Sequence, residues 1–231
     1  MDQEIKKLTP IDSEVPIYCM STGEESLKWK KLASNYKPDW VQPINSYPGV
    51  WARVPDSYYD FIRQVMAKMA PFFAMDVNDV KRVSANYAVV TKSQAELGPY
   101  QTIPHFDNLN PNQIALVHYL CDNQFGGTGF YKHRATGYEE ITVDNHEHYR
   151  DILDNELDEQ SHSQPEYIRS NHPLFHRTQY LEAQFGDIVA FPSNILHSAC
   201  IAGEPPADKM LTEGRLTITS FIVFGKQSTR A

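Results

Sequence analysis

The feature that most constrains the fold is a series of short segments with β-strand character between Val83 and Phe224. They are rich in β-branched and aromatic residues and are separated by glycine, proline, asparagine and aspartate, as in antiparallel sheets. Eight such segments favour a sandwich or jelly roll over a parallel sheet. The expected strands are Val83–Thr91, Tyr100–Phe106, Ile114–Cys121, Thr128–Lys132, Tyr180–Gln184, Ile188–Phe191, His197–Ile201 and Leu216–Phe224.

The residues before this series have helical character. A capping-box pattern, Thr22-Gly23-Glu24-Glu25, precedes a short apolar repeat, and a second repeat runs from Tyr58 to Phe72 at helical spacing. We therefore expect a single domain, residues 1–231, in which helices within 1–82 support a jelly-roll core in 83–224. The first repeat consists of Leu27, Trp29, Leu32 and Tyr36.

A long polar insertion, residues 135–178, interrupts the expected strands. Between Glu139 and Glu159 it carries nine acidic residues and one basic residue, Arg150. Such an insertion is either a functional lid or a solvated surface excursion, and we expect a helix near Asn145–Leu157. The acidic charge points to a small-molecule substrate that is cationic or amine-bearing, such as an amino acid or a carrier-bound one.

Composition excludes several classes of protein. The 231 residues include 29 acidic and 21 basic ones, and the net charge of −8 argues against binding to nucleic acid or to anionic membranes. Three cysteines without short spacings indicate neither a disulfide framework nor a zinc site. No signal peptide and no apolar stretch of membrane-spanning length are found, so we expect a soluble, cytoplasmic protein. The sequence does not indicate an oligomeric state.

The sharpest chemical motif is Pro104-His105-Phe106-Asp107. In a strand, residues two apart face the same side, so His105 and Asp107 would converge on one point. An imidazole and a carboxylate supply two ligands for a divalent first-row metal, and a further histidine would complete a 2-His-1-carboxylate face. His197, in the apolar setting Ile195-Leu196-His197, is the candidate for that third ligand, although a lone buried histidine is more often a core residue.

A third motif, Gly214-Arg215-Leu216-Thr217, begins the last expected strand. Arg215 and Thr217 share one face of that strand with Phe221 and Val223. An inward-facing arginine requires a buried anion, since an unpaired charge is costly there. The anion is either a bound carboxylate, which the planar guanidinium would hold in bidentate fashion, or an acidic residue of the chain itself.

The order of these motifs resembles that of the 2-oxoglutarate- and Fe(II)-dependent dioxygenases, and within them the prolyl-hydroxylase-like branch. The likeness spans about Val83 to Phe224 and includes the Tyr119-Leu120 pair and the turn Phe125-Gly126-Gly127-Thr128-Gly129-Phe130. Two features depart from the family pattern. Arg215 follows His197 by 18 positions, which requires an extended loop at 202–212, and the acidic insertion is unusually long. The run Phe130-Tyr131-Lys132-His133-Arg134 looks more like an uncharacterised bacterial subgroup.

The resemblance implies a double-stranded β-helix in which His105, Asp107 and His197 hold Fe(II). It also implies that Arg215, assisted by Thr217, binds the distal carboxylate of 2-oxoglutarate, and that Tyr119 or Tyr87 donates a hydroxyl to this cosubstrate. The implied reaction is the hydroxylation of a small molecule, because an aspartate at position 107 leaves no place for a halide. Two alternatives remain: a cupin-like metal-binding protein without 2-oxoglutarate turnover, and a non-catalytic jelly-roll binding module.

Overall fold

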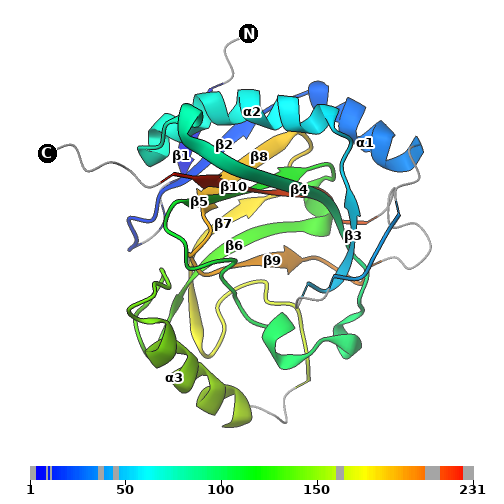
Figure 1. The fold of residues 1–231 in the computed structure, drawn as a ribbon. Coiled ribbons are helices and arrows are strands. Elements are labelled where there is room, and N and C mark those ends of the chain that lie inside the picture. Colours follow the sequence, from blue (N-terminus) through cyan, green and yellow to red (C-terminus); the bar gives the residue numbers. More distant parts are fainter. Residues whose placement is uncertain are drawn as a thin grey trace, which may run out of the picture.

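Two antiparallel sheets face each other in the computed structural model, which describes residues 4–8, 10, 12–35, 39–43, 47–159, 164–205 and 214–225. The large sheet has the order β1-β2-β8-β5-β10-β4-β3, and the small sheet has the order β7-β6-β9 (Figure 1). No helix of the described residues is long and apolar enough to cross a membrane. The strands are β1 (Ile5–Leu8), β2 (Ile17–Ser21), β3 (Gly49–Arg53), β4 (Val80–Val90), β5 (Gln113–Tyr119), β6 (Gly126–His133), β7 (Phe175–Glu182), β8 (Asp187–Pro192), β9 (His197–Ile201) and β10 (Leu216–Phe224).

The chain alternates between the sheets in the manner of a jelly roll, as expected. It passes from β4 to the small-sheet edge at His105, returns to β5, forms β6 and β7, and then places β8, β9 and β10 in alternate sheets. One expected strand, Tyr100–Phe106, is wrong. Only an isolated bridge between His105 and His197 stands there, after a 3-10 turn at Pro99–Gln101. Pro99 and Pro104 lack the N–H groups that a regular ladder needs.

Three further strands lie in the part of the chain expected to supply helices. β1 and β2 extend the large sheet beyond β8, and β3 extends it beyond β4. The loop predicted at 202–212 falls largely outside the described residues, as does Tyr36 in the first expected helix. The helices are α1 (Glu25–Asn35), α2 (Ser57–Met69) and α3 (His146–Glu159).

Close packing of strand backbones explains the two adjacent glycines at the start of β6. Gly126 has a φ of 97°, which L-residues rarely adopt, and a Cβ there would overlap the carbonyl oxygen of Cys200. A Cβ at Gly127 would overlap the carbonyl oxygen of Leu181. The two glycines therefore allow β6 to lie between β7 and β9.

The acidic insertion is packed against the small sheet. Tyr149 and Leu153 of α3 are buried in a cluster with Tyr131 and Phe175, and the buried ring of His133 lies 2.8 Å from a carboxylate oxygen of Glu156. The expected helix in this region is confirmed as α3, which Figure 1 shows below the small sheet. The insertion is therefore a structural layer of the fold and not a solvated excursion.

Helices α1 and α2 cover the outer face of the large sheet (Figure 1). Along α2 the apolar residues Tyr58, Phe61, Ile62, Val65 and Met69 are buried, as the helical spacing predicted, whereas Phe72, the last residue of the expected repeat, lies beyond the helix and is exposed. The helix ends at Met69 and passes into a 3-10 turn, Ala70–Phe73, because the proline in this turn lacks an N–H for the helical ladder.

A buried histidine ties both helices to the sheet. His118 of β5 is fully buried, and its Nε2 lies 2.7 Å from the Ser26 hydroxyl of α1 while its Nδ1 lies 3.2 Å from the Tyr58 hydroxyl of α2. A neutral imidazole has one donor and one acceptor, and the rotating hydroxyls can match either arrangement. Burial lowers the pKa of His118 to about 3, so the ring is uncharged at neutral pH.

This burial predicts a pH dependence of folding. In the unfolded chain His118 titrates near its ordinary pKa, so between about pH 6.5 and pH 3 the unfolded state binds the additional proton. Stability from this residue is complete above that window and decreases as the pH falls through it, by up to about 1.4 kcal/mol per pH unit. We expect His118→Gln to be less stable at pH 7 by about 1–3 kcal/mol, because two hydrogen bonds are disturbed. Its stability should fall less steeply with acid.

The measurement is urea unfolding at a series of pH values for both proteins. Other titrating groups contribute equally to the two curves and cancel in the difference between them. Parallel curves from pH 7 to pH 4 would contradict the prediction.

Candidate metal centre and adjoining pocket

Reciprocal main-chain hydrogen bonds bring the two histidines together. The N–H of His105 donates to the carbonyl of His197 over 2.9 Å, and the N–H of His197 donates to the carbonyl of His105 over 2.8 Å. Residues paired in this way on antiparallel chains carry their side chains on the same face. The two imidazole rings consequently lie with their centroids 4.5 Å apart.

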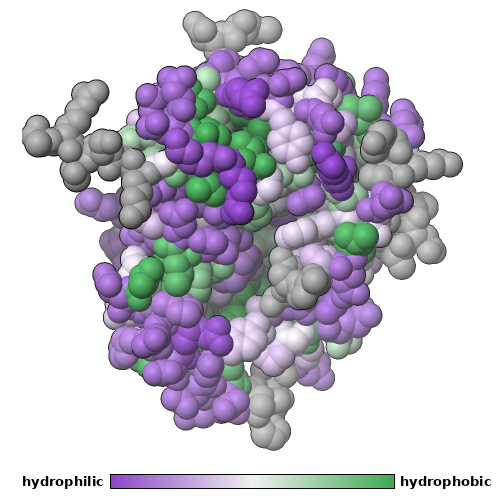
Figure 2. All heavy atoms as spheres, in the orientation of Figure 1, coloured by the Kyte–Doolittle hydropathy of each residue, from purple (hydrophilic) through white to green (hydrophobic). Residues whose placement is uncertain are grey.

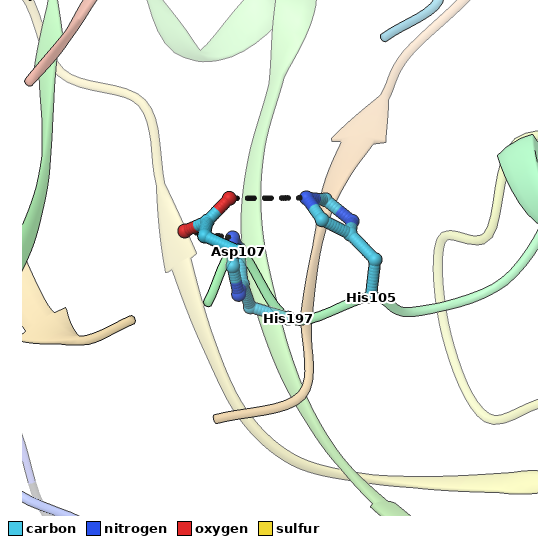
Figure 3. Close-up of side chains that lie close together, drawn as sticks. All are labelled: His105, Asp107 and His197. Atoms are coloured by element: carbon cyan, nitrogen blue, oxygen red, sulfur yellow. Dashed lines mark ion pairs between the residues drawn. The ribbon is translucent and has the colours of Figure 1, made fainter. Parts of the chain in front are cut away.

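A turn after β8 fixes the position of Asp107. The main-chain N–H groups of Asp107 and Asn108 both donate to the carbonyl of Ser193, over 2.8 and 3.2 Å. The Asp107 carboxylate then lies 3.7 Å from Nε2 of His105 and 3.5 Å from Nε2 of His197. Figure 3 shows the three side chains pointing toward one another, and their ligand atoms all lie within 4.8 Å.

The protonation of His197 suits a metal ligand. Its Nδ1 lies 2.9 Å from the carbonyl oxygen of Ile195, which can only accept, so Nδ1 carries the proton and Nε2 presents its lone pair toward Asp107. Burial lowers the pKa of His197 to about 4, which keeps the ring neutral at pH 7. Burial also raises the pKa of Asp107 to about 6, although the neighbouring His105 opposes this shift.

The donor set fits a divalent first-row metal. Two imidazole nitrogens and one carboxylate oxygen match the preference of Fe(II), and three ligands on one side leave other positions open. The two distances from the carboxylate to the imidazole nitrogens, 3.5 and 3.7 Å, and the bound of 4.8 Å on all three separations exceed the roughly 3 Å of adjacent ligands at bond lengths near 2.1 Å. Small side-chain rotations would close this gap around an ion.

The three side chains line a hollow of about 640 Å³, within the range of roughly 300–1,000 Å³ of small-molecule sites. Figure 2 shows the molecule hollowed near the centre of this face. Residues of β4, β5, β8 and β10 form one wall, and α3 contributes Tyr149, Arg150 and Leu153 to another. The hollow therefore lies between the sheets and the insertion.

Arg215, one residue before β10, lines the same hollow and is only 5% exposed. Its Nη2 donates to the carbonyl of Gly127 over 3.0 Å and lies 3.4 Å from the Thr128 hydroxyl, while its buried Nε has no hydrogen-bond partner among the described residues. No carboxylate forms an ion pair with it within the described part of the chain, which does not include residues 206–213. A buried cation with a spare donor is suited to an anionic ligand.

Of the other three residues expected near a cosubstrate, Tyr119 and Thr217 lie on the Arg215 side of the sheet and Tyr87 does not. The hydroxyl of Tyr119 lies 2.5 Å from that of Thr128, and the Tyr119 ring lies 5.6 Å from the Arg215 guanidinium. Thr217 lines the hollow, and its hydroxyl lies 3.4 Å from the carbonyl oxygen of Ala88. Tyr87 lies on the opposite face of the sheet and donates to the Trp29 carbonyl over 3.0 Å, away from the hollow.

Several residues of the hollow were not predicted from the sequence. Tyr47 lines it, and although burial raises the pKa of this tyrosine, the charge of Arg215 opposes the increase, so the two lie close together. Trp51, Arg82 and Tyr149 also line it. No motif marks these residues, because β3, β4 and α3 bring them together from distant parts of the chain.

Known structures share this fold at low sequence identity. HygX from Streptomyces hygroscopicus, solved with nickel and 2-oxoglutarate, matches with a TM-score of 0.52 and 11% identity over 90% of this chain and 83% of HygX. The non-haem alpha-ketoglutarate-dependent carbocyclase SnoK from nogalamycin biosynthesis matches with a TM-score of 0.51 and 11% identity, over 91% and 80% of the two chains. A Pseudomonas putida prolyl-4-hydroxylase reaches a TM-score of 0.44 at 13% identity, over 91% of this chain and 93% of that one.

The chain thus shares the fold of these two structures, one of them solved with 2-oxoglutarate, and a His-Asp-His group stands in its hollow. No curated protein matches the sequence significantly. Residues 21–222 match the model of a family of unknown function, DUF6445, and the chain belongs to that family.

The site predicts specific metal binding. We expect the wild type to bind one equivalent of Ni(II), and His197→Ala or Asp107→Ala to weaken binding at least about tenfold, because even residues that only support metal ligands have effects of this size. Isothermal titration calorimetry measures the affinity. His148→Ala is the matched control, since it removes an exposed imidazole from α3. An equal loss in this control would contradict the assignment of the site.

Proposed function

We propose that this protein is a 2-oxoglutarate- and O2-dependent non-haem Fe(II) oxygenase that hydroxylates a small molecule. His105, Asp107 and His197 would hold the metal. The observation that carries the proposal is the buried guanidinium of Arg215, which shares a hollow with this group and pairs with no carboxylate among the described residues. A site that holds only a metal does not require such an arginine.

The register of the small sheet supports a ligand of defined length. His197 pairs with Phe130 of β6, and the Arg215 guanidinium contacts Gly127 and Thr128, two to three residues away on the same strand. At about 3.3 Å per residue this separation is roughly 7–10 Å. We call His105, Asp107 and His197 together the metal group. The span suits a five-carbon dicarboxylate with one end at the metal group and the other at Arg215.

The residues between the metal group and Arg215 would each contribute differently to binding of 2-oxoglutarate. Arg215 binds the distal carboxylate with its spare Nε donor, and Thr217 lies beside it on the same face of the sheet. Tyr119 packs against the guanidinium and, through Thr128, holds it in place. The apolar ring of Phe191 lines the hollow beside His197 and packs on Phe130 behind it.

Bound Fe(II) and 2-oxoglutarate would supply the oxidising chemistry, in which 2-oxoglutarate and O2 yield succinate and CO2 as a C–H bond is oxidised. The protein would bind, orient and shield the reactants. Cys19, Cys121 and Cys200 are free and buried, which agrees with a reducing compartment such as the cytoplasm.

The experiment is an anaerobic titration of the protein with Fe(II) and 2-oxoglutarate, followed by the weak visible charge-transfer band of the ternary complex. We expect the band with the wild type and its loss in His105→Ala. In Arg215→Gln the affinity for 2-oxoglutarate should fall at least about tenfold, since a charge-assisted hydrogen bond is lost. The matched ligand is 2-oxovalerate, which has the same five carbons without the distal carboxylate, and its affinity should be unchanged by Arg215→Gln.

Three outcomes distinguish the proposal from its rivals. Metal binding without any band or affinity for 2-oxoglutarate would indicate a cupin-like metal protein. Absence of both metal and 2-oxoglutarate binding would indicate a non-catalytic module. Equal losses for 2-oxoglutarate and 2-oxovalerate in Arg215→Gln would contradict the role of the arginine.

A further inference from the structure

The charge of the hollow is opposite to that of the protein. The whole chain carries a net charge of −8, yet among the described residues the charged ones that line the hollow are Arg82, Arg150 and Arg215 against one carboxylate, Asp107. Asp107 belongs to the metal group. The other charged residues that line the described part of the hollow are therefore all positive.

The insertion contributes to this contrast despite its acidic composition. Its described residues that line the hollow are Tyr149, Arg150, Leu153 and Tyr167, and none of its carboxylates does so. Arg150 lies 3.8 Å from Asp154, which also accepts a hydrogen bond from Tyr100 over 2.6 Å. Its charge is thus partly balanced at the rim.

Arg82 is the cation best placed for a second ligand. It lies on β4, lines the hollow, and forms no ion pair or hydrogen bond with any residue that the structure describes. The hydroxyl of the buried Tyr149, which lines the same hollow, lacks a partner among the described residues. A spare donor in the same hollow as a free cation favours a ligand with acceptor atoms.

The register of the large sheet locates Arg82 relative to the metal group. A row of inward-facing residues, paired across neighbouring strands, crosses the large sheet and begins at Phe191. The ring centroid of Phe191 lies 4.6 Å from that of His197. This row therefore passes beneath the metal group. It consists of Phe191, Ala115, Phe221 and Ser84.

Arg82 and Arg215 lie on opposite sides of this row. Arg215 precedes Phe221 by six positions along the chain, whereas Arg82 pairs with Val223, two positions beyond it. A cosubstrate that extends from the metal group to Arg215 leaves the opposite side of the hollow open. Tyr100, Phe106 and Tyr149 provide flat apolar surface in the hollow, whereas Trp51 lies level with Thr217 on the side of Arg215.

We infer that the substrate is an organic anion with a flat apolar body, and that Arg82 binds its anionic group. This inference rests on the proposed oxygenase function, in that the second molecule is the one oxidised. The acidic insertion had pointed to a cationic substrate, but its carboxylates do not line the hollow.

The test uses three probes with the same phenyl ring and chain: the anion 3-phenylpropanoate, the neutral 3-phenylpropanamide and the cation 3-phenylpropylamine. Each is titrated calorimetrically into the full chain saturated with Ni(II) and 2-oxoglutarate, which occupy the metal group and Arg215. We expect the anion to bind about tenfold more tightly than the amide, and the amine to bind most weakly. Arg82→Gln should remove about tenfold of the affinity for the anion and leave that for the amide unchanged, and Arg82→Lys should restore part of it.

Lys81→Gln is the matched control, because it removes the same charge from the next position of β4, which does not line the hollow. Its affinity for the anion should equal that of the wild type. Equal or tighter binding of the amine, no detectable binding of the anion at millimolar concentration, or equal effects of Arg82→Gln and Lys81→Gln would each overturn the inference.

Separate titrations distinguish this inference from the proposed function. If Ni(II) and 2-oxoglutarate bind but the anion does not, the substrate inference alone fails. If neither Ni(II) nor 2-oxoglutarate binds while the anion still binds in a manner that depends on Arg82, the oxygenase proposal fails and the anion site stands.

Discussion

The pairing of two main-chain segments, at His105 and His197, is the interaction on which the site depends. At the edge of the small sheet these segments form an isolated bridge and not a full strand pair, through two main-chain hydrogen bonds of 2.8 and 2.9 Å. They place two imidazoles on one face, and the contacts of the following turn with Ser193 bring Asp107 to them. Because the histidines lie 92 positions apart, only the closure of the two sheets makes this group.

Charge inside the hollow is the second constraint. Burial of the Arg215 guanidinium is expensive, and main-chain and hydroxyl acceptors at Gly127 and Thr128 compensate it in part. The remaining positive charge is a property of the cavity, whereas the surface of the protein is acidic. An anionic cosubstrate on one side of the metal group and an anionic substrate on the other would both relieve this imbalance. The polar insertion shapes the cavity by packing against the small sheet.

Much of this organisation could be predicted from the sequence. Seven of the eight expected strands are present, since alternating β-branched and aromatic residues between turn residues specify local extended structure. The eighth expected strand, Tyr100–Phe106, is absent because Pro99 and Pro104 cannot donate main-chain hydrogen bonds. His105 and Asp107 nevertheless lie close together, as that strand had predicted. Strands β1 to β3 were missed, because their pairing partners, not their own composition, stabilise them.

The sequence by itself determined the chemical types at the site, namely two imidazoles, one carboxylate and one arginine that begins an apolar strand. It also determined the order of strands that carries them, because residue pattern and turn chemistry act locally. Only the tertiary structure decided which tyrosine adjoins Arg215, Tyr119 and not Tyr87, and that Arg82 faces the same hollow. These choices depend on which face of a twisted sheet a residue occupies and on which layer covers that face, and both are set by contacts between distant segments.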